Sequence, residues 1–425
     1  MIVKGATMDT TTHSHKKHAT AVAPFHSHFF ESLHKEQWQE VRLGEIAEIF
    51  DHKRVPLSAM QRNNRKGIYP YYGASGIIDY IDDFIFDGEF ILISEDGENL
   101  KTRKTPIAFR ANGKFWVNNH AHIIKGKKPY LNSLIIYLFR NIDLNPYITG
   151  AVQPKLNQAT LLNISFTIPI AESTRQQIAE ILSSFDDKID LLHRQNKTLE
   201  SLALTLFRHT FVDNPKNPNA PCHSGQACNC HSEPALVGEE SIDIKSHRDI
   251  SASPQYDKWE IGKLGDYITP KKGKNITQKN AIKGIYPVIA GGLEPAYYHN
   301  QSNTESPVIT ISASGANAGF VNIHYCPVWS SDSSYIDKTI TPYVYFFYLF
   351  LKMNQNILYD KQEGSAQPHI YPSHIMELEI PHYPKNLIET FESQIQIYFD
   401  KISHNMGEIQ NLQSMRDMLL QKLLE

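Results

Sequence analysis

The sequence predicts an α+β protein in which two similar α/β domains alternate with two long helices that pair as an antiparallel coiled coil. Three observations support this prediction: an internal duplication, a seven-residue apolar repeat in two segments, and short apolar runs bounded by turn residues. With 425 residues, of which 41% are hydrophobic and 20% charged, the chain can hold two or three domains of ordinary globular composition.

The duplication is visible as motifs of the first half that return in the second half in the same order. Trp38 returns as Trp259, 221 residues later, and Asp187 returns as Asp400, 213 residues later. Between these pairs, 67–70 (Gly-Ile-Tyr-Pro) returns as 284–287, the apolar run 91–94 as 309–312, and 150–154 as 364–368. Small loop deletions account for the falling separation. The preserved order argues against chance and indicates two similar sites in one chain.

The duplication and the composition divide the chain into six stretches. These are a mobile leader at 1–37, a first repeat at 38–169, a first long helix at 170–211, a linker at 212–258, a second repeat at 259–384 and a second long helix at 385–425. Within the repeats, short apolar runs between turn signals such as Asp96-Gly97 and Asn112-Gly113 predict strands. Residues 131–142 predict a helix, and 342–353 occupy the matching place in the second repeat.

Both long helices carry an apolar residue every seven positions, which is typical of a coiled coil. The rows in the first helix are Ile178, Phe185, Leu192, Leu199, Leu206 and Leu182, Ile189, Asn196, Ala203; those in the second are Phe391, Tyr398, Asn405, Leu412, Leu419 and Ile395, Ile402, Ile409, Arg416, Leu423. A polar residue in such a seam fixes register, so Asn196 and Asn405 are the candidates for that role. A pseudo-two-fold relation between the halves makes the helices antiparallel. The alternative is that each helix packs only on its own domain.

Charge and apolar content limit the functional classes. The net charge of −3 speaks weakly against nucleic-acid binding, but lysine and arginine cluster locally, for example at 53–66, 101–104, 125–128 and 271–274. Such clusters are either phosphate contacts or solvated loops. The sequence shows no secretory signal, and the longest aromatic run, 343–351, is too short to span a bilayer, so we expect a cytoplasmic protein without a membrane role. Four cysteines suggest no disulfide framework.

Several motifs in this order resemble one family. They are Trp38 with Leu43-Gly44, Tyr69-Pro70 with Gly73, Asn118-Asn119-His120-Ala121-His122, Gln153-Pro154-Lys155-Leu156-Asn157, and 175–182 at the entry to the first helix. Together with the duplication, they make the chain resemble the specificity subunits of type I restriction–modification systems. The resemblance covers about residues 38–211 and 259–425.

The resemblance implies that each repeat is a target-recognition domain reading one part of a bipartite sequence in double-stranded DNA. The helices then set the spacer between the two parts and dock two modification subunits, which methylate adenine, and restriction subunits join to form the nuclease. This chain has no catalytic site and binds no cofactor in that scheme, while S-adenosylmethionine, ATP and Mg are expected on the partner subunits. The sequence agrees, because it lacks a phosphate-binding loop lysine motif and the Asn-Pro-Pro-Tyr motif of adenine methyltransferases.

Direct reading of DNA depends on side chains that suit base edges or phosphates: arginine and lysine suit guanine, and asparagine and glutamine suit adenine. The candidates in the first repeat are Lys101, Arg103, Lys104, Asn118, Asn119 and His120; those in the second are Lys271, Lys272, Lys274, Ser330, Ser331 and Asp332.

The linker carries a weak metal candidate. Cys222, Cys228, Cys230 and His231 supply three thiolates and an imidazole, which is a possible zinc set. The spacing is not that of a common zinc motif, so we favour an unliganded linker and expect no metal site.

Two other functional classes stay open at this stage. A coiled-coil scaffold protein without a DNA role explains the helices but leaves the duplicated domains unexplained. An independent nuclease or methyltransferase lacks a recognisable site in the sequence.

Overall fold

The computed structural model describes residues 36–150, 153–219, 258–364 and 367–424. The chain separates into two compact units: unit 1 comprises 1–188 and 412–425, and unit 2 comprises 189–411. The linker candidates Cys222, Cys228, Cys230 and His231 lie outside the described residues, as does most of the leader. Within the described residues, no helix combines the length and apolar character needed to cross a membrane.

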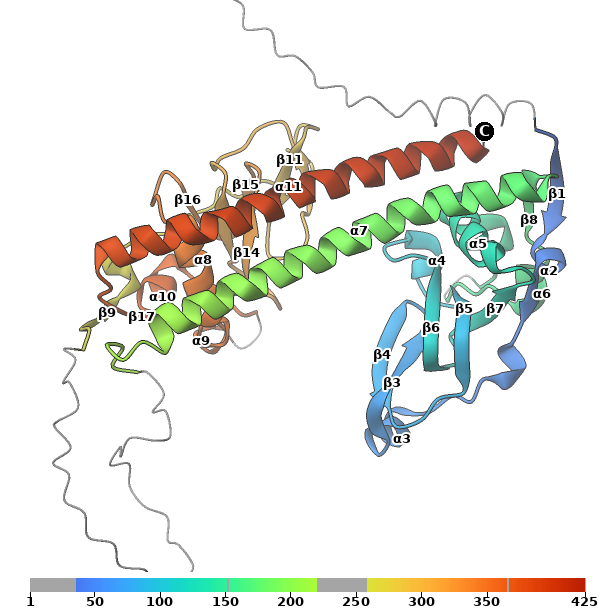
Figure 1. The fold of residues 1–425 in the computed structure, drawn as a ribbon, viewed down its shortest axis with the longest axis horizontal. Coiled ribbons are helices and arrows are strands. Elements are labelled where there is room, and N and C mark those ends of the chain that lie inside the picture. The colour runs from blue at the N-terminus through green and yellow to red at the C-terminus, as the bar shows by residue number, and fades with distance from the viewer. Residues whose placement is uncertain (1–35, 151–152, 220–257, 365–366, 425) are drawn as a thin grey trace, which may run out of the picture. The chain divides into compact units, whose positions relative to one another are not determined.

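Unit 1 holds the first repeat (Figure 1). Its strands are β1 (Trp38–Arg42), β2 (Ala47–Ile49), β3 (Lys66–Gly73), β4 (Gly76–Ile81), β5 (Phe86–Ser94), β6 (Ala108–Val117), β7 (Ala121–Gly126) and β8 (Ser165–Pro169). Its helices are α2 (Leu43–Ile46), η1 (Asp51–Lys53), α3 (Ala59–Asn63), α4 (Asn99–Thr102), α5 (Pro129–Asn141), η2 (Asn145–Tyr147), α6 (Gln158–Leu162) and the first part of α7 (Glu172–Phe207).

The core of unit 1 is a six-stranded sheet in the order β2-β7-β5-β6-β3-β4. Its central strand β5 buries Ile91, Leu92 and Ile93 completely, so one face of β5 packs against α5 while the other supports an aromatic cluster around Phe115. A two-stranded sheet of β1 and β8 lies at the entry to α7.

Unit 2 holds the second repeat. Its strands are β9 (Ile261–Lys263), β10 (Lys271–Lys272), β11 (Tyr286–Ile289), β12 (Tyr297–His299), β13 (Val308–Ser312), β14 (Val321–His324), β15 (Trp329–Ser330), β16 (Ser333–Asp337) and β17 (Glu379–Pro381). Its helical elements are η3 (Arg208–Val212, a π-helix that continues α7), η4 (Leu264–Asp266), α8 (Val344–Met353), α9 (Gln355–Asp360), α10 (Pro372–Met376) and most of α11 (Lys385–Leu424).

The two sheets of unit 2 correspond to the single large sheet of unit 1. One sheet has the order β10-β16-β13-β14 and the other the order β12-β11-β15. Strand β6 of unit 1 pairs with both β5 and β3. In unit 2, β14 pairs with β13 and β15 pairs with β11, so two strands take the place of β6. The second repeat therefore keeps the strand order of the first and interrupts one strand.

The glycine of the repeated Gly-Ile-Tyr-Pro motif is required for the same steric reason in both units. A Cβ on Gly67 would lie 2.4 Å from the backbone oxygen of Ile81, and a Cβ on Gly284 would lie 2.3 Å from that of His299. Only glycine allows β3 and β11 to approach their partner strands this closely. The duplication seen in the sequence therefore reflects a duplicated backbone geometry.

The helices α7 and α11 pack antiparallel within each unit. In unit 1, Ile178 and Leu182 share a core with Leu419 and Leu420. In unit 2, Phe207 contacts Phe391 with ring centroids 5.7 Å apart, and Asn405 donates to Asn196 at 2.8 Å. Two mixed helix-and-strand repeats and two long antiparallel helices confirm the predicted α+β fold class.

The predicted heptad rows need one correction at the end of α7. Leu206 is 38% exposed, and Phe207 beside it is buried instead. An ideal α-helix drifts by about 20° per heptad against a strict seven-residue repeat, so four heptads after Ile178 the buried seam has moved by nearly one residue. Phe399 is also buried although it lies outside the predicted rows of α11, because its ring stacks on Tyr345 with the ring centroids 4.4 Å apart.

Candidate nucleic-acid interface

Three separate segments of the first repeat are held together by backbone hydrogen bonds. Glu95 N donates to His120 O at 2.9 Å, Gly97 N to Pro154 O at 3.0 Å, and Leu156 N to Glu95 O at 2.8 Å. Thr149 and Lys155 exchange a further pair of bonds at 2.8 Å each. We call the segments 95–97, 118–120 and the described residues of 149–156 loop frame 1.

The second repeat builds the same frame from its own residues. Ala313 N donates to Asp332 O at 3.1 Å, Gly315 N to Pro368 O at 3.1 Å, and Ile370 N to Ala313 O at 2.9 Å, while Glu363 and His369 exchange a pair at 3.0 and 2.8 Å. The segments 313–315, 330–332 and the described residues of 363–370 form loop frame 2. Two equivalent surfaces of fixed backbone geometry therefore occur, one in each unit.

A left-handed glycine turns the same loop in each frame. Gly150 has φ +86°, and a Cβ there would lie 2.3 Å from the backbone oxygen of Gln153. Gly364 has φ +97°, and a Cβ there would lie 2.6 Å from the backbone oxygen of Gln367. The turn exposes both glutamine side chains. Because glutamine suits adenine in the major groove, this repeated position is a candidate base contact that the sequence reasoning listed only as a family motif.

A tryptophan anchors a further loop against each frame. Trp116 Nε1 donates to Val55 O at 2.6 Å, and Trp329 Nε1 donates to Lys274 O at 2.8 Å. These bonds bring Val55 and Lys274 to equivalent positions. The loops that carry Lys53, Arg54 and Lys271–Lys274 are thus fixed by the same device in both units.

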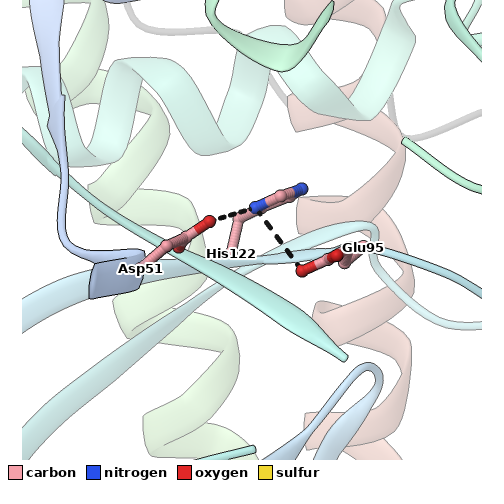
Figure 2. Close-up of side chains that lie close together, drawn as sticks. All are labelled: Asp51, Glu95 and His122. Atoms are coloured by element: carbon pink, nitrogen blue, oxygen red, sulfur yellow. Dashed lines mark hydrogen bonds and ion pairs between the residues drawn. The ribbon is translucent and has the colours of Figure 1, made fainter. Parts of the chain in front are cut away.

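Frame 1 is built around a buried network of charged side chains. Figure 2 shows Asp51, Glu95 and His122 converging from η1, the end of β5 and β7. His122 Nδ1 lies 2.5 Å from Asp51 Oδ2 and 3.8 Å from Glu95 Oε2. Arg54 joins both carboxylates, at 3.2 Å from Asp51 and 2.7 Å from Glu95.

The network is better explained as a compensated ion cluster than as a metal centre. The ligand atoms of Asp51, Glu95 and His122 lie close enough together for an ion. However, the Arg54 guanidinium already contacts both carboxylates and also donates to Ala121 O at 2.9 Å. His122 Nε2 faces Leu156 O at 2.8 Å, so both ring nitrogens are already engaged within the protein. Lys155 Nζ also lies 3.4 Å from Glu95 Oε1, so Arg54 and Lys155 are the two cations that compensate the two carboxylates.

Frame 2 is supported by polar but largely uncharged side chains, and strand register places Ser334 where frame 1 has His122. Ser330 Oγ and Ser333 Oγ lie 2.8 Å apart, and Asn303 brackets Ser330 by donating to its oxygen and accepting from its nitrogen. Ser331 Oγ contacts Asn275 Oδ1 at 3.2 Å. The backbone frame is therefore compatible with either a charged or a neutral interior.

The predicted contact residues of the first repeat divide into two groups. Lys101, Lys104 and Asn119 are exposed, and His120 presents a half-exposed ring with its Nδ1 2.9 Å from Asp96. By contrast, Asn118 is buried and accepts from His120 N at 2.8 Å, while Arg103 donates to Arg140 O and Ile142 O at the end of α5. Asn118 and Arg103 thus shape the surface, whereas the first group is free to touch a ligand.

The second repeat shows the same division. Lys271, Lys272 and Lys274 are exposed, and Asp332 is half-buried and accepts from Ser314 Oγ. Ser330 is fully buried and Ser331 nearly so. The prediction that these two serines contact DNA does not fit their burial, and their hydroxyls support frame 2 instead. Sequence reasoning also missed Asp51 and Glu95 as network residues.

The two remaining predicted residues, Asn196 and Asn405, lie in the helix pair of unit 2. They hydrogen-bond each other, and the Asn196 Nδ2 and Asn405 Oδ1 atoms have no partner among the described residues. A polar pair in an apolar seam is the arrangement that specifies register.

Comparison with known proteins identifies the family. The model described as type I restriction modification DNA specificity domain matches residues 35–201 and 256–409. The chain belongs to this family of type I restriction–modification specificity proteins. DNA sequence recognition is what the family implies, and the two matched ranges include both loop frames.

Individual relatives agree with the family match. A putative type I restriction enzyme specificity subunit of Haemophilus influenzae is 36% identical over 142 residues, which cover 33% of this chain and 36% of that protein. The MjaIX specificity subunit of Methanocaldococcus jannaschii is 25% identical over 362 residues, covering 77% of each chain.

A solved structure supports the fold. The crystal structure of the type I restriction-modification S subunit from M. genitalium has a TM-score of 0.57 at 15% identity, covering 92% of this chain and 96% of that one. At this identity the likeness concerns the fold alone.

Proposed function

We propose that this chain is the sequence-specific DNA-binding subunit of a type I restriction–modification complex and that each repeat reads one part of a bipartite target. Loop frame 1 reads one part and loop frame 2 the other. The chain itself is non-catalytic in this proposal. S-adenosylmethionine, ATP and Mg belong to the modification and restriction subunits that join it, and the complex works in the cytoplasm.

The observation that carries the proposal is the recurrence of one backbone frame with two sets of side chains. The hydrogen bonds of the two frames match in pattern, but Asp96, His120 and Lys155 stand where frame 2 has Ser314, Asp332 and His369. A protein that reads two different half-sites needs equal geometry and unequal chemistry, because direct readout depends on the donors and acceptors that each side chain presents. A scaffold without a DNA role has no need of this arrangement.

The helix pair supplies a reason for a fixed spacer. Arg416 donates to Asp186 at 2.5 Å in unit 1, and Asn405 donates to Asn196 in unit 2. Both polar pairs penalise a slipped register, since sliding one helix leaves a buried polar group without its partner. We propose that this register sets the spacer length and that the helices also dock two modification subunits.

Exchange of one repeat tests the two-reader proposal. Residues 259–384 are replaced by the matching domain of a relative, and the methylated sequence is determined for the reconstituted complex. The expected result is a change in one half-site, with the other half-site and the spacer retained. Simultaneous change of both half-sites contradicts the proposal, as does methyl transfer from labelled S-adenosylmethionine by the purified chain alone.

Matched alanine variants at one equivalent frame position sharpen the test. Lys155 and His369 occupy equivalent positions, so Lys155→Ala and His369→Ala should each relax one base position in a different half-site, at a cost of about 1–3 kcal/mol. Lys272→Ala, at an exposed lysine of β10, serves as the phosphate control. It should weaken binding across sequences and flatten the salt dependence.

A further inference from the structure

Both repeats expose the same apolar residues on a two-stranded ribbon. In β3, Ile68 is 80% exposed, and its equivalent Ile285 just before β11 is 79% exposed. Tyr80 pairs with Pro70, and Tyr298 pairs with Pro287, so these tyrosines are also equivalent; they are 50% and 53% exposed. Other exposed apolar residues in the same stretches of sequence are Met60, Ile77 and Ile78 in the first repeat and Ile282 and Leu293 in the second.

Exposed isoleucine at matching places in two copies requires an explanation. Single apolar residues on a surface are ordinary, but contiguous groups mark contact sites. The core does not need Ile68 or Ile285, because four-fifths of each side chain faces solvent. The glycine beside each isoleucine permits the close strand approach, whereas most of the isoleucine side chain stays exposed among the described residues.

The charges of the ribbon favour a protein over DNA as the occupant. Arg62 and Lys66 lie 3.2 and 2.7 Å from Asp79, and Arg65 lies 2.9 Å from Asp82. Between residues 60 and 83, three basic residues thus face the three acidic residues Asp79, Asp82 and Asp83, and between 282 and 298 the only charges are Lys283 and Glu294. DNA binding draws on unpaired positive charge, whereas the three cations of the first ribbon are paired and the second ribbon carries one lysine, Lys283.

We propose that the ribbons, defined as Ile68 with Tyr80 in the first repeat and Ile285 with Tyr298 in the second, are a duplicated docking surface for an apolar face of a protein present in two copies. This proposal rests on the proposed function and names the modification subunit as that protein. Each ribbon contacts one copy, in addition to the docking on the helices. An aromatic and a long aliphatic side chain surrounded by paired charges is the composition of an interface core with a polar rim.

Opposite charge substitutions at one position distinguish a protein occupant from DNA. The variants Ile68→Asp and Ile68→Lys are each combined with the same change at Ile285, and the binding of the purified modification subunit is measured by calorimetry. Both charged double variants should weaken partner binding at least tenfold, because either charge must be desolvated at an apolar contact. A DNA contact predicts opposite effects instead: lysine raises the affinity for a target duplex, and aspartate lowers it.

Single variants and a control complete the experiment. Ile68→Asp alone should weaken one of the two partner sites and leave the other. Ile357→Asp, at a residue of α9 that is 47% exposed and lies off the ribbon, should leave both sites unchanged. Circular dichroism and thermal unfolding confirm that every variant is folded, which is expected for substitutions at exposed positions.

The possible outcomes separate the two proposals. If the wild-type chain binds two modification subunits and both double variants do so with unchanged affinity, the ribbon proposal is wrong while the proposed function stands. Opposite effects on duplex affinity with unchanged partner binding also overturn the ribbon proposal in favour of DNA. If the wild-type chain binds neither a modification subunit nor a target duplex, the proposed function itself is wrong.

Discussion

The two loop frames share a backbone and differ in how their interiors are satisfied. In frame 1, Asp51, Arg54, Glu95 and His122 form a compensated ion cluster, with His122 only 1% exposed. In frame 2, short serine and asparagine side chains occupy the corresponding interior. The difference shows that the fold specifies the path of the loops and leaves their electrostatic support to each repeat.

The two kinds of support have different energetic consequences. A buried ion cluster contributes modestly when complete, but the loss of one member leaves an uncompensated charge in the interior. A neutral hydroxyl network tolerates the loss of a member at the smaller cost of one unsatisfied group. Frame 1 should therefore be the more sensitive of the two to substitution of a single interior residue.

The largest expected effect follows from removing Asp51. Its carboxylate accepts from His122 Nδ1 at 2.5 Å and from Ile123 N at 2.8 Å, and it lies 3.2 Å from Arg54. Asp51→Ala should lower the free energy of unfolding of unit 1 by about 3–5 kcal/mol. Because the two units need not unfold together, the measurement is native-state hydrogen exchange resolved by peptide.

The comparison change in frame 2 is Ser333→Ala, which removes the hydrogen-bond partner of Ser330 Oγ in the neutral network. It should cost unit 2 about 1–2 kcal/mol. Equal losses of unfolding free energy in the two units would show that the charges of the cluster do not make frame 1 more sensitive. The expected difference between the two frames would then be wrong.

Much of the fold could be predicted because the features that repeat are those that the backbone requires. Gly67 and Gly284 permit a close strand approach, and Gly150 and Gly364 adopt positive φ. Such positions accept one residue type, so they survive in both copies and reveal the duplication. The heptad rows were predictable because a helix seam needs apolar residues at a regular spacing, except at Leu206, where the drift of a 3.6-residue helix moves the seam.

The site was harder to predict, because its cluster joins segments far apart in the sequence and has no counterpart in the second repeat. Asp51 and His122 are 71 residues apart, and strand register places Ser334 where unit 1 has His122. The burial of Ser330 could not be inferred either, since it is enclosed by Asn303, which lies 27 residues away in the sequence, and by Ser333. The predicted lysines remain candidates whose base or phosphate contacts are untested.

A second difference between the repeats should appear as selective sensitivity to acid. Strand register places His324 of β14 where β6 has Ala111, and His324 Nε2 lies 2.9 Å from Thr310 Oγ1. Burial lowers the pKa of His324 to about 4, from 6.5 in the unfolded chain. The stabilisation from the neutral ring is therefore complete above pH 6.5 and is lost as the pH falls toward 4.

Unit 2 should accordingly lose about 2 kcal/mol between pH 7.5 and pH 5 through this group. His324→Gln should remove that loss while keeping a polar partner for Thr310. His404→Gln, at an exposed histidine of α11, should leave it intact. The measurement is hydrogen exchange of β13 and β14 peptides at both pH values, and an unchanged acid loss in His324→Gln contradicts the assignment.

The smallest expected effect concerns the device that the two repeats share. Trp116 and Trp329 each donate from Nε1 to a backbone oxygen of the anchored loop, at 2.6 and 2.8 Å. Phenylalanine retains most of the apolar surface but cannot donate, so the oxygen of Val55 or Lys274 loses its partner. Trp116→Phe and Trp329→Phe should each cost about 1–2 kcal/mol and speed amide exchange around 53–56 or 272–275, with little effect on the other unit.

Similar losses in both units would show that the anchor belongs to the common frame, in contrast to the ion cluster around Asp51. A loss confined to Trp116→Phe would show instead that even this contact depends on the charged surroundings of frame 1, since Arg65 also lies over the Trp116 ring, 5.0 Å from its centroid.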